Sequence, residues 1–404
     1  MRRKKAAAGH RPHAARQPRM AAASSPTPTS SARASRDRRT DRRRRNMAFF
    51  ARRADGFRLE RMQASRQYAD GGFVNTYPSS TGREPADRPT LVDFLFRGEG
   101  RTPERPLPAS DPRATWRRPV ETGLRATWLG HSTVLLEIDG QRILTDPVWG
   151  MRASPLPFAG PRRFQPVPVD IDALPPLDAV LISHDHYDHL DYPSIRALAA
   201  RRVPFVTSLG VGVHLEAWGV PAGRIVELDW WEHSVLPGGL TISAAPSHHF
   251  SGRGLRDRNA TLWSSFALRG ERHAVFFSGD TGLSPAFAEI GRRLGPFDLV
   301  MIEVGAFHPS WGNVHLGPDN ALRAWAQLGS GRFLPVHWGT FNLAMHPWAQ
   351  PADVLLAKAP EGLLMPRLGE PVEPARLETP EPWWREPTAA PRESGFPVLP
   401  VKDI

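Results

Sequence analysis

Apolar-rich runs recur along the middle of the chain, and polar residues follow each of them directly. Four such runs cover residues 179–182, 240–247, 274–279 and 332–336, and each is followed by a histidine or an aspartate. Short apolar runs bounded by polar turn residues are typical of buried strands. Because polar groups at strand ends gather at one edge of a layered α/β fold, the pattern predicts that these side chains lie together.

Segments with helix signals separate the strand-like runs. They cover residues 193–202, about 210–218, 285–294 and 318–328. Three of them begin with proline, which suits a first helical turn because the N–H that proline lacks would have no partner there. Gly295 and Gly329 suit the ends of two of these helices, because glycine readily adopts the backbone conformation that terminates a helix.

The first part of the body has the signature of a hairpin. Asp139-Gly140 is a two-residue turn signal between the apolar-rich runs 133–138 and 141–145. Hairpins combined with helical crossovers predict mixed sheets with helices outside them. The expected fold class is therefore α/β, an αββα four-layer sandwich.

The net charge of +11 is concentrated at one end of the chain. Residues 1–46 contain 15 Lys and Arg and 2 Asp, whereas the remaining 358 residues contain 37 basic and 39 acidic side chains. This basic extension lacks the hydrophobic residues of a core and is predicted to be disordered. Residues 47–118 are interpreted as an arm over the body, as a lid or a dimer contact. Residues 119–368 are predicted to form the body, and loose packing is expected in the Pro-rich tail 369–404.

Composition excludes several kinds of site and location. The chain has no cysteine, so it has neither disulfides nor thiolate metal ligands. It has no run of 18 apolar residues, so no transmembrane helix is predicted. Its basic start is not followed by a continuous apolar segment, which argues against a secretory signal. A cytoplasmic protein is expected, with peripheral contact to a membrane as an alternative.

The sequence His-Asp-His-Tyr-Asp-His at residues 184–189 concentrates potential metal ligands. Neutral imidazole and carboxylate together suit zinc and related divalent ions. His184 and His186 are two residues apart, so their side chains point the same way in an extended chain. Asp188 and His189 follow at once, which suits a second ion. A solvated polar loop is the alternative, but the other three strand ends supply the further ligands that two ions need.

The order His-x-His-x-Asp-His, then His, then Gly-Asp-Thr, then His-Trp-Gly resembles the metallo-β-lactamase superfamily. Longer strings narrow the resemblance to the N-acyl-phosphatidylethanolamine-hydrolysing phospholipase D family and its bacterial relatives. These strings are residues 160–164, 181–192, 227–232, 295–298 and 336–341. The resemblance runs from about Thr127 to about Pro347 and implies the same αββα fold.

That resemblance implies a centre of two divalent metal ions, with zinc expected and iron or manganese as alternatives. The implied ligands are His184, His186 and His249 for one ion, Asp188, His189 and His337 for the other, and Asp280 as a bridge. The neighbouring His248 stays an alternative to His249. Two ions about 3.5 to 4 Å apart can share a water and lower its pKa toward about 7, which provides hydroxide near neutral pH.

The resemblance makes Asp188, Asp280 and His315 the candidate catalytic residues. His315 resembles a family histidine beside the metals, and it can protonate a leaving group or hold a phosphate oxygen. A surface histidine near a helix start is the alternative. Asp146 either orients a ligand histidine or serves only as a turn residue before proline. The same two interpretations apply to His131, for which a structural role is favoured.

Several neighbouring side chains have open roles. Tyr187 lies between ligands, so its phenol is a candidate substrate contact, with packing as the alternative. Arg162 and Arg163 either bind an anionic headgroup or are simply solvated. Residues 305–311, Gly-Ala-Phe-His-Pro-Ser-Trp, depart from the family pattern, because a tyrosine and an arginine are missing. The headgroup and acyl preferences are therefore open.

The function that the resemblance implies is a phosphodiesterase of phospholipase D type, which hydrolyses N-acyl phospholipids through a metal-bridging hydroxide. The implied partner is a phospholipid or small-molecule substrate, and a peripheral membrane contact and a homodimer are open alternatives. A lactonase or another phosphodiesterase on the same centre is the second hypothesis. A nucleic-acid-binding protein acting through the basic extension is the third. This hypothesis is disfavoured because binding phosphates through the basic extension would not require the set of metal ligands found in the body.

Deleting residues 1–46 should leave folding and small-substrate hydrolysis nearly unchanged, because the segment has no core-forming residues. Thermal unfolding and turnover of the truncated protein, compared with those of the full chain, check this expectation. Loss of the folded state or of turnover would show that the extension is integral to the protein.

Overall fold

The computed structural model describes residues 53–78, 98–329, 331–358, 360–376 and 379–386. The basic extension 1–46 and the end of the Pro-rich tail lie outside the described residues, so the expectation of disorder for the extension stays a prediction. Within the described part of the chain, no helix is both long enough and apolar enough to span a bilayer.

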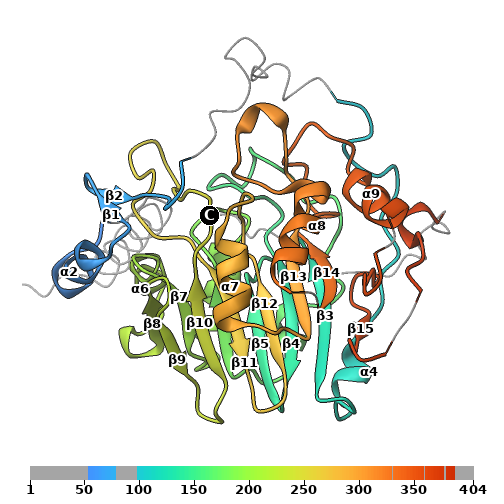
Figure 1. The fold of residues 1–404 in the computed structure, drawn as a ribbon, viewed down its shortest axis with the longest axis horizontal. Coiled ribbons are helices and arrows are strands. Elements are labelled where there is room, and N and C mark those ends of the chain that lie inside the picture. Colours follow the sequence, from blue (N-terminus) through green and yellow to red (C-terminus); the bar gives the residue numbers. More distant parts are fainter. Residues whose placement is uncertain (1–52, 79–97, 330, 359, 377–378, 387–404) are drawn as a thin grey trace, which may run out of the picture. The chain divides into compact units, whose positions relative to one another are not determined.

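Two mixed sheets form the centre of the fold (Figure 1). The larger sheet contains, in spatial order, β15 (Pro371–Val372), β3 (Leu124–Gly130), β4 (Thr133–Ile138), β5 (Gln141–Thr145), β6 (Ala179–Ile182), β7 (Phe205–Ser208) and β8 (Ile225–Leu228). The smaller sheet contains β14 (Arg332–Val336), β13 (Leu299–Glu303), β12 (Ala274–Phe277), β11 (Ser265–Arg269), β10 (Thr241–Ala245) and β9 (His233–Val235). Strands β5 to β8 are parallel, as are β12 to β14, and the other pairs are antiparallel.

Helices follow the parallel strands. They are α5 (Tyr192–Ala199) after β6, α6 (Gly212–Ala217) after β7, α7 (Ala286–Leu294) after β12 and α8 (Gly317–Gln327) after β13. Figure 1 shows α7 and α8 in front of the smaller sheet. The remaining described elements are α2 (Gly56–Ala64), α4 (Arg113–Trp116), α9 (Gln350–Lys358), the short pair β1 (Tyr68–Ala69) and β2 (Gly72–Phe73), and four short 3₁₀ turns.

Strand β4 shows why the fold has four layers. Its residues Val134 and Leu136 belong to the apolar cluster between the two sheets, whereas Leu135 belongs to a second cluster with Ile195 and Leu198 of α5. Successive strand residues point to opposite faces, so a strand buried on both faces lies between a second sheet and a layer of helices. The αββα sandwich expected from the sequence is confirmed.

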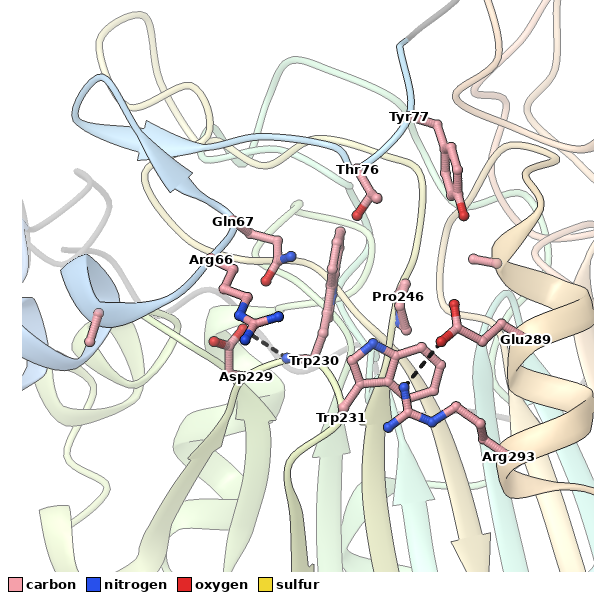
Figure 2. Close-up of a pocket in the computed structure, with 12 residues that line it drawn as sticks. Arg66, Gln67, Thr76, Tyr77, Asp229, Trp230, Trp231, Pro246, Glu289 and Arg293 are labelled. Carbon is pink, nitrogen blue, oxygen red and sulfur yellow. Dashed lines mark hydrogen bonds and ion pairs between the residues drawn. The ribbon is translucent and has the colours of Figure 1, made fainter.

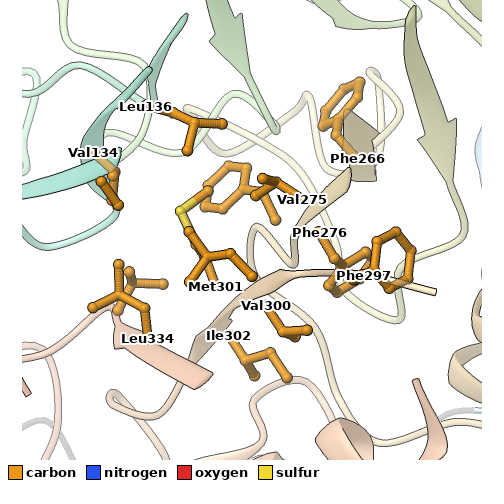
Figure 3. Close-up of a cluster of buried hydrophobic side chains, with 14 of the residues drawn as sticks. Val134, Leu136, Phe266, Val275, Phe276, Phe297, Val300, Met301, Ile302 and Leu334 are labelled. Atoms are coloured by element: carbon orange, nitrogen blue, oxygen red, sulfur yellow. The ribbon is translucent and has the colours of Figure 1, made fainter. Parts of the chain in front are cut away.

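The apolar cluster between the sheets fixes their strands relative to each other (Figure 3). Val134 and Leu136 of β4 lie across from Val275 of β12 and Met301 of β13, and all four are fully buried. Burying a side chain of this size stabilises a fold by about 1.5–3 kcal/mol. The polar residues at the strand ends are therefore carried on a closely packed scaffold.

Several local predictions are confirmed. Asp139 and Gly140, with φ of 47° and 86°, form the two-residue turn between β4 and β5, where Ile138 pairs with Gln141. Gly295 caps the C-terminus of α7. Helix α5 ends at Ala199, earlier than predicted, and the chain turns soon afterwards.

The expectation of loose packing after Gly369 is wrong for two tryptophans. Trp383 and Trp384 are only 2% and 4% exposed, and their rings lie 5.9 and 5.7 Å from that of Trp338. The Trp383 indole N–H donates to the Met365 carbonyl at 2.8 Å. Frequent prolines prevent regular structure, but they do not prevent large apolar rings from being buried against the body.

Residues 53–78, the described start of the arm, are anchored on the body. Met62 of α2 and Phe73 of β2 are buried in one cluster with Leu209 and Trp263. The Arg58 guanidinium forms ion pairs with two glutamates of the body, at 2.6 and 2.8 Å. The interpretation of this segment as an arm is therefore favoured, and its use as a lid or a dimer contact stays a prediction.

Candidate metal centre

Segments at the ends of four strands converge on one point. Strands β6, β12 and β14 lead directly into it, and the segment after β10 reaches it as well. The side chains brought together there are His184, His186, Asp188, His189, His249, Asp280 and His337. These seven belong to overlapping clusters of potential metal ligands that also include His131, Glu303 and His315, so all seven residues that the resemblance implied as ligands lie in one place. Around Asp280 they fall into two adjacent groups.

The first group consists of three imidazole nitrogens and one carboxylate oxygen. The Nδ1 atom of His186 lies 2.9 Å from Nε2 of His184 and 3.2 Å from Nε2 of His249. Oδ2 of Asp280 lies 3.8 and 3.6 Å from the same two Nε2 atoms. Nitrogen ligands about 2.0–2.1 Å from a tetrahedral zinc are about 3.3 Å apart. The group therefore has the spacing of ligands around a single ion.

The second group shares Asp280 with the first. Its Oδ1 atom lies 3.1 Å from Nε2 of His189 and 3.2 Å from Nε2 of His337. Oδ2 of Asp188 lies 3.5 and 3.3 Å from these same two nitrogens. Asp280 thus presents one oxygen to each group, which is the geometry that a bridging ligand requires.

Three buried atoms of the second group make no hydrogen bond within the described residues: Nε2 of His189, Nε2 of His337 and Oδ1 of Asp280. Leaving a buried polar group without a partner costs about 1–3 kcal/mol, and more when the group is charged. A cation between these atoms would satisfy all three at once. The residues present therefore fit a bound metal ion.

The charges of the site agree with this fit. Burial holds the pKa of His184 and of His249 well below the usual value, so both imidazoles stay in the neutral form that binds metals. Burial also lowers the pKa of His337, but the Asp280 and Asp188 carboxylates outweigh it and raise that pKa to about 10. The two carboxylates therefore favour positive charge at the second group.

Asp146 at the end of β5 aims two of the histidines. Its Oδ2 atom accepts a hydrogen bond from Nδ1 of His189 at 2.7 Å and another from the Ser183 hydroxyl at 2.6 Å. The same hydroxyl lies 2.9 Å from Nδ1 of His184. Because both Nδ1 atoms are engaged, both Nε2 atoms are left for the centre. The orienting role for Asp146 is favoured over that of a simple turn residue.

His249, rather than its neighbour His248, joins the first group. Nδ1 of His249 donates to the Val314 carbonyl at 2.8 Å, which turns Nε2 toward the other ligands. The backbone N–H of His248 donates to the Thr281 hydroxyl, and no candidate metal group in the described residues includes its ring. The geometry favours His249 as the ligand.

His315 lies beside the two groups and is hydrogen-bonded to the buried glutamate Glu303. Its Nδ1 atom is 2.8 Å from Oε2 of Glu303 and 4.0 Å from Oδ2 of Asp280. Burial lowers the pKa of His315, but the Glu303 carboxylate outweighs it and raises that pKa above the usual value. Sequence reasoning missed Glu303, although a carboxylate that ends the apolar run Leu299–Glu303 was an available signal.

His131 contacts a candidate ligand, which differs from the structural role favoured by the sequence. Its Nε2 atom lies 2.9 Å from Oδ2 of Asp188. Burial and the neighbouring charge of His337 lower the pKa of His131 to about 3, so the ring is neutral and can donate one hydrogen bond to the carboxylate. It therefore orients Asp188.

Two candidate substrate contacts have structural partners instead. The Tyr187 phenol donates to the Arg253 carbonyl at 2.7 Å, so packing accounts for its position. The buried guanidinium of Arg163 donates to the carbonyls of Val148 and Gly150 at 2.6 and 3.1 Å. Arg163 is therefore not the headgroup-binding cation considered from the sequence. Its neighbour Arg162 is exposed.

Arg253, which sequence reasoning also missed, holds the ligand-bearing loop. Its guanidinium donates to the carbonyls of Asp185 and Leu190 at 2.6 and 2.9 Å, and it lies 3.9 Å from the centre of the Tyr187 ring. These contacts tie together the two ends of the loop between β6 and α5. No local pattern marks an arginine about 65 positions downstream for this role.

A family model described as the beta-lactamase superfamily domain matches residues 141–338. The chain is 46% identical over 332 residues to the uncharacterized protein Rv0906 of Mycobacterium tuberculosis, covering 80% of this chain and 88% of that one. It is 39% identical over 247 residues to N-acyl-phosphatidylethanolamine-hydrolyzing phospholipase D 1 of Caenorhabditis elegans, covering 58% and 69%. Isothiocyanate hydrolase from Delia radicum gut bacteria shares the fold, with a TM-score of 0.50, 20% identity, and coverage of 62% and 98%.

Asp280→Asn should reduce metal affinity and lower turnover by orders of magnitude, because both ligand groups share this one carboxylate. Chelator competition and steady-state hydrolysis measure the two effects. Asp172→Asn removes the same charge from a side chain that is 95% exposed, and it serves as the matched control. If Asp280→Asn behaves like this control, Asp280 is not a ligand.

Proposed function

The chain belongs to the beta-lactamase superfamily and is a metal-dependent hydrolase, and we propose that it is a dinuclear phosphodiesterase of phospholipase D type that acts on N-acyl phospholipids. The observation that carries the proposal is the Asp280 carboxylate, which faces two adjacent ligand groups with one oxygen each. The relative from Caenorhabditis elegans, named for this activity, supports the choice of substrate.

The ligand set suits an anionic ester. A pair of divalent ions, when bound, supplies an activated water and stabilises negative charge on a phosphoryl oxygen. Only two of the seven candidate ligands, Asp188 and Asp280, are carboxylates, so the ligands leave positive charge uncompensated. That charge attracts a phosphodiester more strongly than a neutral ester. Imidazole and carboxylate ligands without cysteine favour zinc, with iron and manganese as alternatives.

The pair formed by His315 and Glu303 supplies the proton for the leaving group. Glu303 is itself fixed, because its Oε1 atom accepts from the backbone N–H groups of Thr281 and Leu316 at 3.0 and 3.2 Å. With Nδ1 of His315 held by the other carboxylate oxygen, Nε2 is the ring atom left to face the substrate. A histidine in this arrangement can donate a proton to the departing oxygen.

A loop beside the site offers a peripheral membrane contact. Met151, Leu156 and Phe158 are 55%, 45% and 75% exposed, and the exposed Arg162 lies on the same loop. The loop follows Asp146, and Arg163 near its end bridges to Phe341, so both of its ends adjoin segments that carry the site. Apolar side chains next to a cationic one suit insertion at an anionic lipid surface.

The residues at the site define the acyl chain and headgroup that the substrate would carry less closely than the proposed reaction. Phe307 stands where the family pattern has tyrosine, and its ring stacks on that of His346 with centroids 4.4 Å apart. This position therefore offers packing and no hydroxyl to a substrate. Lactones and other phosphodiesters consequently belong among the substrates tested.

Metal-reconstituted protein should contain about two equivalents of zinc, iron or manganese per chain, as measured by elemental analysis. It should hydrolyse N-acyl-phosphatidylethanolamine faster than lactones or a soluble nitrophenyl phosphodiester. One equivalent or fewer would refute the dinuclear centre. Hydrolysis of lactones alone would replace the proposed activity by the lactonase hypothesis.

His315→Ala should keep both metals but slow hydrolysis of unactivated esters by roughly 10²-fold or more. The loss should shrink for an activated nitrophenyl phosphodiester, because its leaving group departs without needing a proton. Turnover on the two substrate types, with metal content measured in parallel, checks this. Equal losses on both types would remove the acid role and leave His315 as a binding or structural residue.

Replacing Leu156 and Phe158 together by serine should weaken sedimentation with vesicles that contain phosphatidylserine. It should leave hydrolysis of the soluble phosphodiester unchanged, because both side chains are exposed. Val235→Ser is the matched control, since Val235 is 58% exposed on strand β9. Equal vesicle binding by the loop variant and the control would exclude this surface.

A further inference from the structure

The arm reaches the candidate metal centre through one side chain, that of Asn75. The Asn75 amide donates from Nδ2 to the His249 carbonyl at 2.8 Å and accepts at Oδ1 from the His249 N–H at 3.1 Å. The Trp263 indole N–H also donates to Oδ1, at 3.2 Å, which sets the orientation of the amide. Asn75 therefore pairs with the peptide groups of His249 as a neighbouring strand would.

His249 lies where its backbone has left the sheet. Strand β10 ends at Ala245, which is paired with Ser265, and the ligand follows four residues later. The Val314 carbonyl fixes the His249 ring through Nδ1, but it does not hold the main chain. The main chain of His249 is held by the Asn75 amide, which hydrogen-bonds to both the N–H and the carbonyl of that residue.

The arm brings Asn75 to this position from a firm anchor. Arg58 and Arg61 of α2 bond to Glu227, and the buried Phe73 donates its N–H to the Asn259 carbonyl at 2.8 Å. Burial alternates from Phe73 onward, with residues 73, 75 and 77 turned inward and 74 and 76 exposed. The segment is therefore extended, and its spacing carries the Asn75 side chain to the same side as Phe73.

Beyond Asn75 the arm borders open space. Thr76 and Tyr77 line one side of a cavity of about 520 Å³, and Trp230, Trp231 and Pro246 line the other (Figure 2). Packing beyond Asn75 is therefore incomplete, although Tyr77 contacts the apolar core, and the hydrogen bonds of Asn75 link the arm to the segment that carries His249.

We infer that Asn75 is a positioning residue for the candidate ligand His249, and that arm docking and metal binding are thereby coupled. The inference rests on the proposed metal centre. Removing a partner that aims a metal ligand typically weakens metal affinity 10–100-fold. Coupling between two binding events is reciprocal, so a bound metal strengthens arm docking by the same factor.

The coupling should affect one ion and not both. His249 lies in the cluster with His184, His186 and Asp280 and in no other. His189 and His337 instead contact Oδ1 of Asp280 and Oδ2 of Asp188. In the full-length protein, Asn75→Ala should weaken binding of one cobalt ion by 10–100-fold, change its visible absorption spectrum, and leave the other ion nearly unaffected. Chelator competition and the spectrum measure these effects without any reference to activity.

Two further variants sharpen the test. Thr76→Ala is the matched control, because Thr76 is the next residue of the arm and is exposed. Asn75→Asp keeps the two hydrogen bonds that Oδ1 accepts and removes the one donated to the His249 carbonyl, so it should lower affinity for the same ion. Zinc should slow tryptic cleavage at the exposed Arg66 in the wild type and in Thr76→Ala, but not in Asn75→Ala.

Either of two results overturns the inference. The first is that Asn75→Ala and Asn75→Asp bind both ions as tightly as Thr76→Ala, with the same spectrum. The second is that both ions are weakened equally as the melting temperature of the metal-free protein falls, which would make Asn75 a stabiliser of the fold. A wild-type chain that binds only one ion refutes the dinuclear proposal instead, and the effect of Asn75 is then measured on that ion.

Discussion

The buried carboxylate of Asp280 is the constraint on which the rest of the site depends. It lies among four imidazole rings, two on each side, and one of its oxygens makes no hydrogen bond within the described residues. An ionised carboxylate is stable in such a place only when positive charge surrounds it. Each candidate ligand would therefore rely on the others and on a cation at the centre, and metal binding would be linked to folding.

Around the Asp280 carboxylate, hydrogen bonds orient the imidazole rings. Asp146, Val314 and Glu303 each engage the Nδ1 atom of a different histidine, so that Nε2 is left for the centre or the substrate. These partners come from separate segments, and they stay in place because the apolar core fixes the two sheets. The arm extends the same arrangement, since Asn75 holds the main chain of the candidate ligand His249, whose ring is oriented by the Val314 carbonyl.

Residues differ in how far the sequence could reveal them. The candidate ligands are recognisable because imidazole and carboxylate in a set order after apolar runs are uncommon except at metal sites. Glu303, Arg253 and Asn75 are ordinary residue types, and their roles arise from contacts between distant segments. Asn75 and His249, for example, are 174 positions apart. Tyr187 and Arg163 show the opposite case, because the sequence marked both as candidate substrate contacts, yet both bond to backbone carbonyls.

By itself the sequence determined strands β4, β5, β6, β12 and β14, helices α5 to α8, the hairpin at Asp139-Gly140 and the set of candidate metal ligands, because turn chemistry, periodicity and side-chain type are properties of neighbouring positions. Only the tertiary structure decided that the ring of His249 joins the ligand group in place of His248, that His131 contacts Asp188, and that Trp383 is buried. The physical reason is that each of these depends on the distance between segments far apart in the chain, which packing sets and which no local pattern encodes.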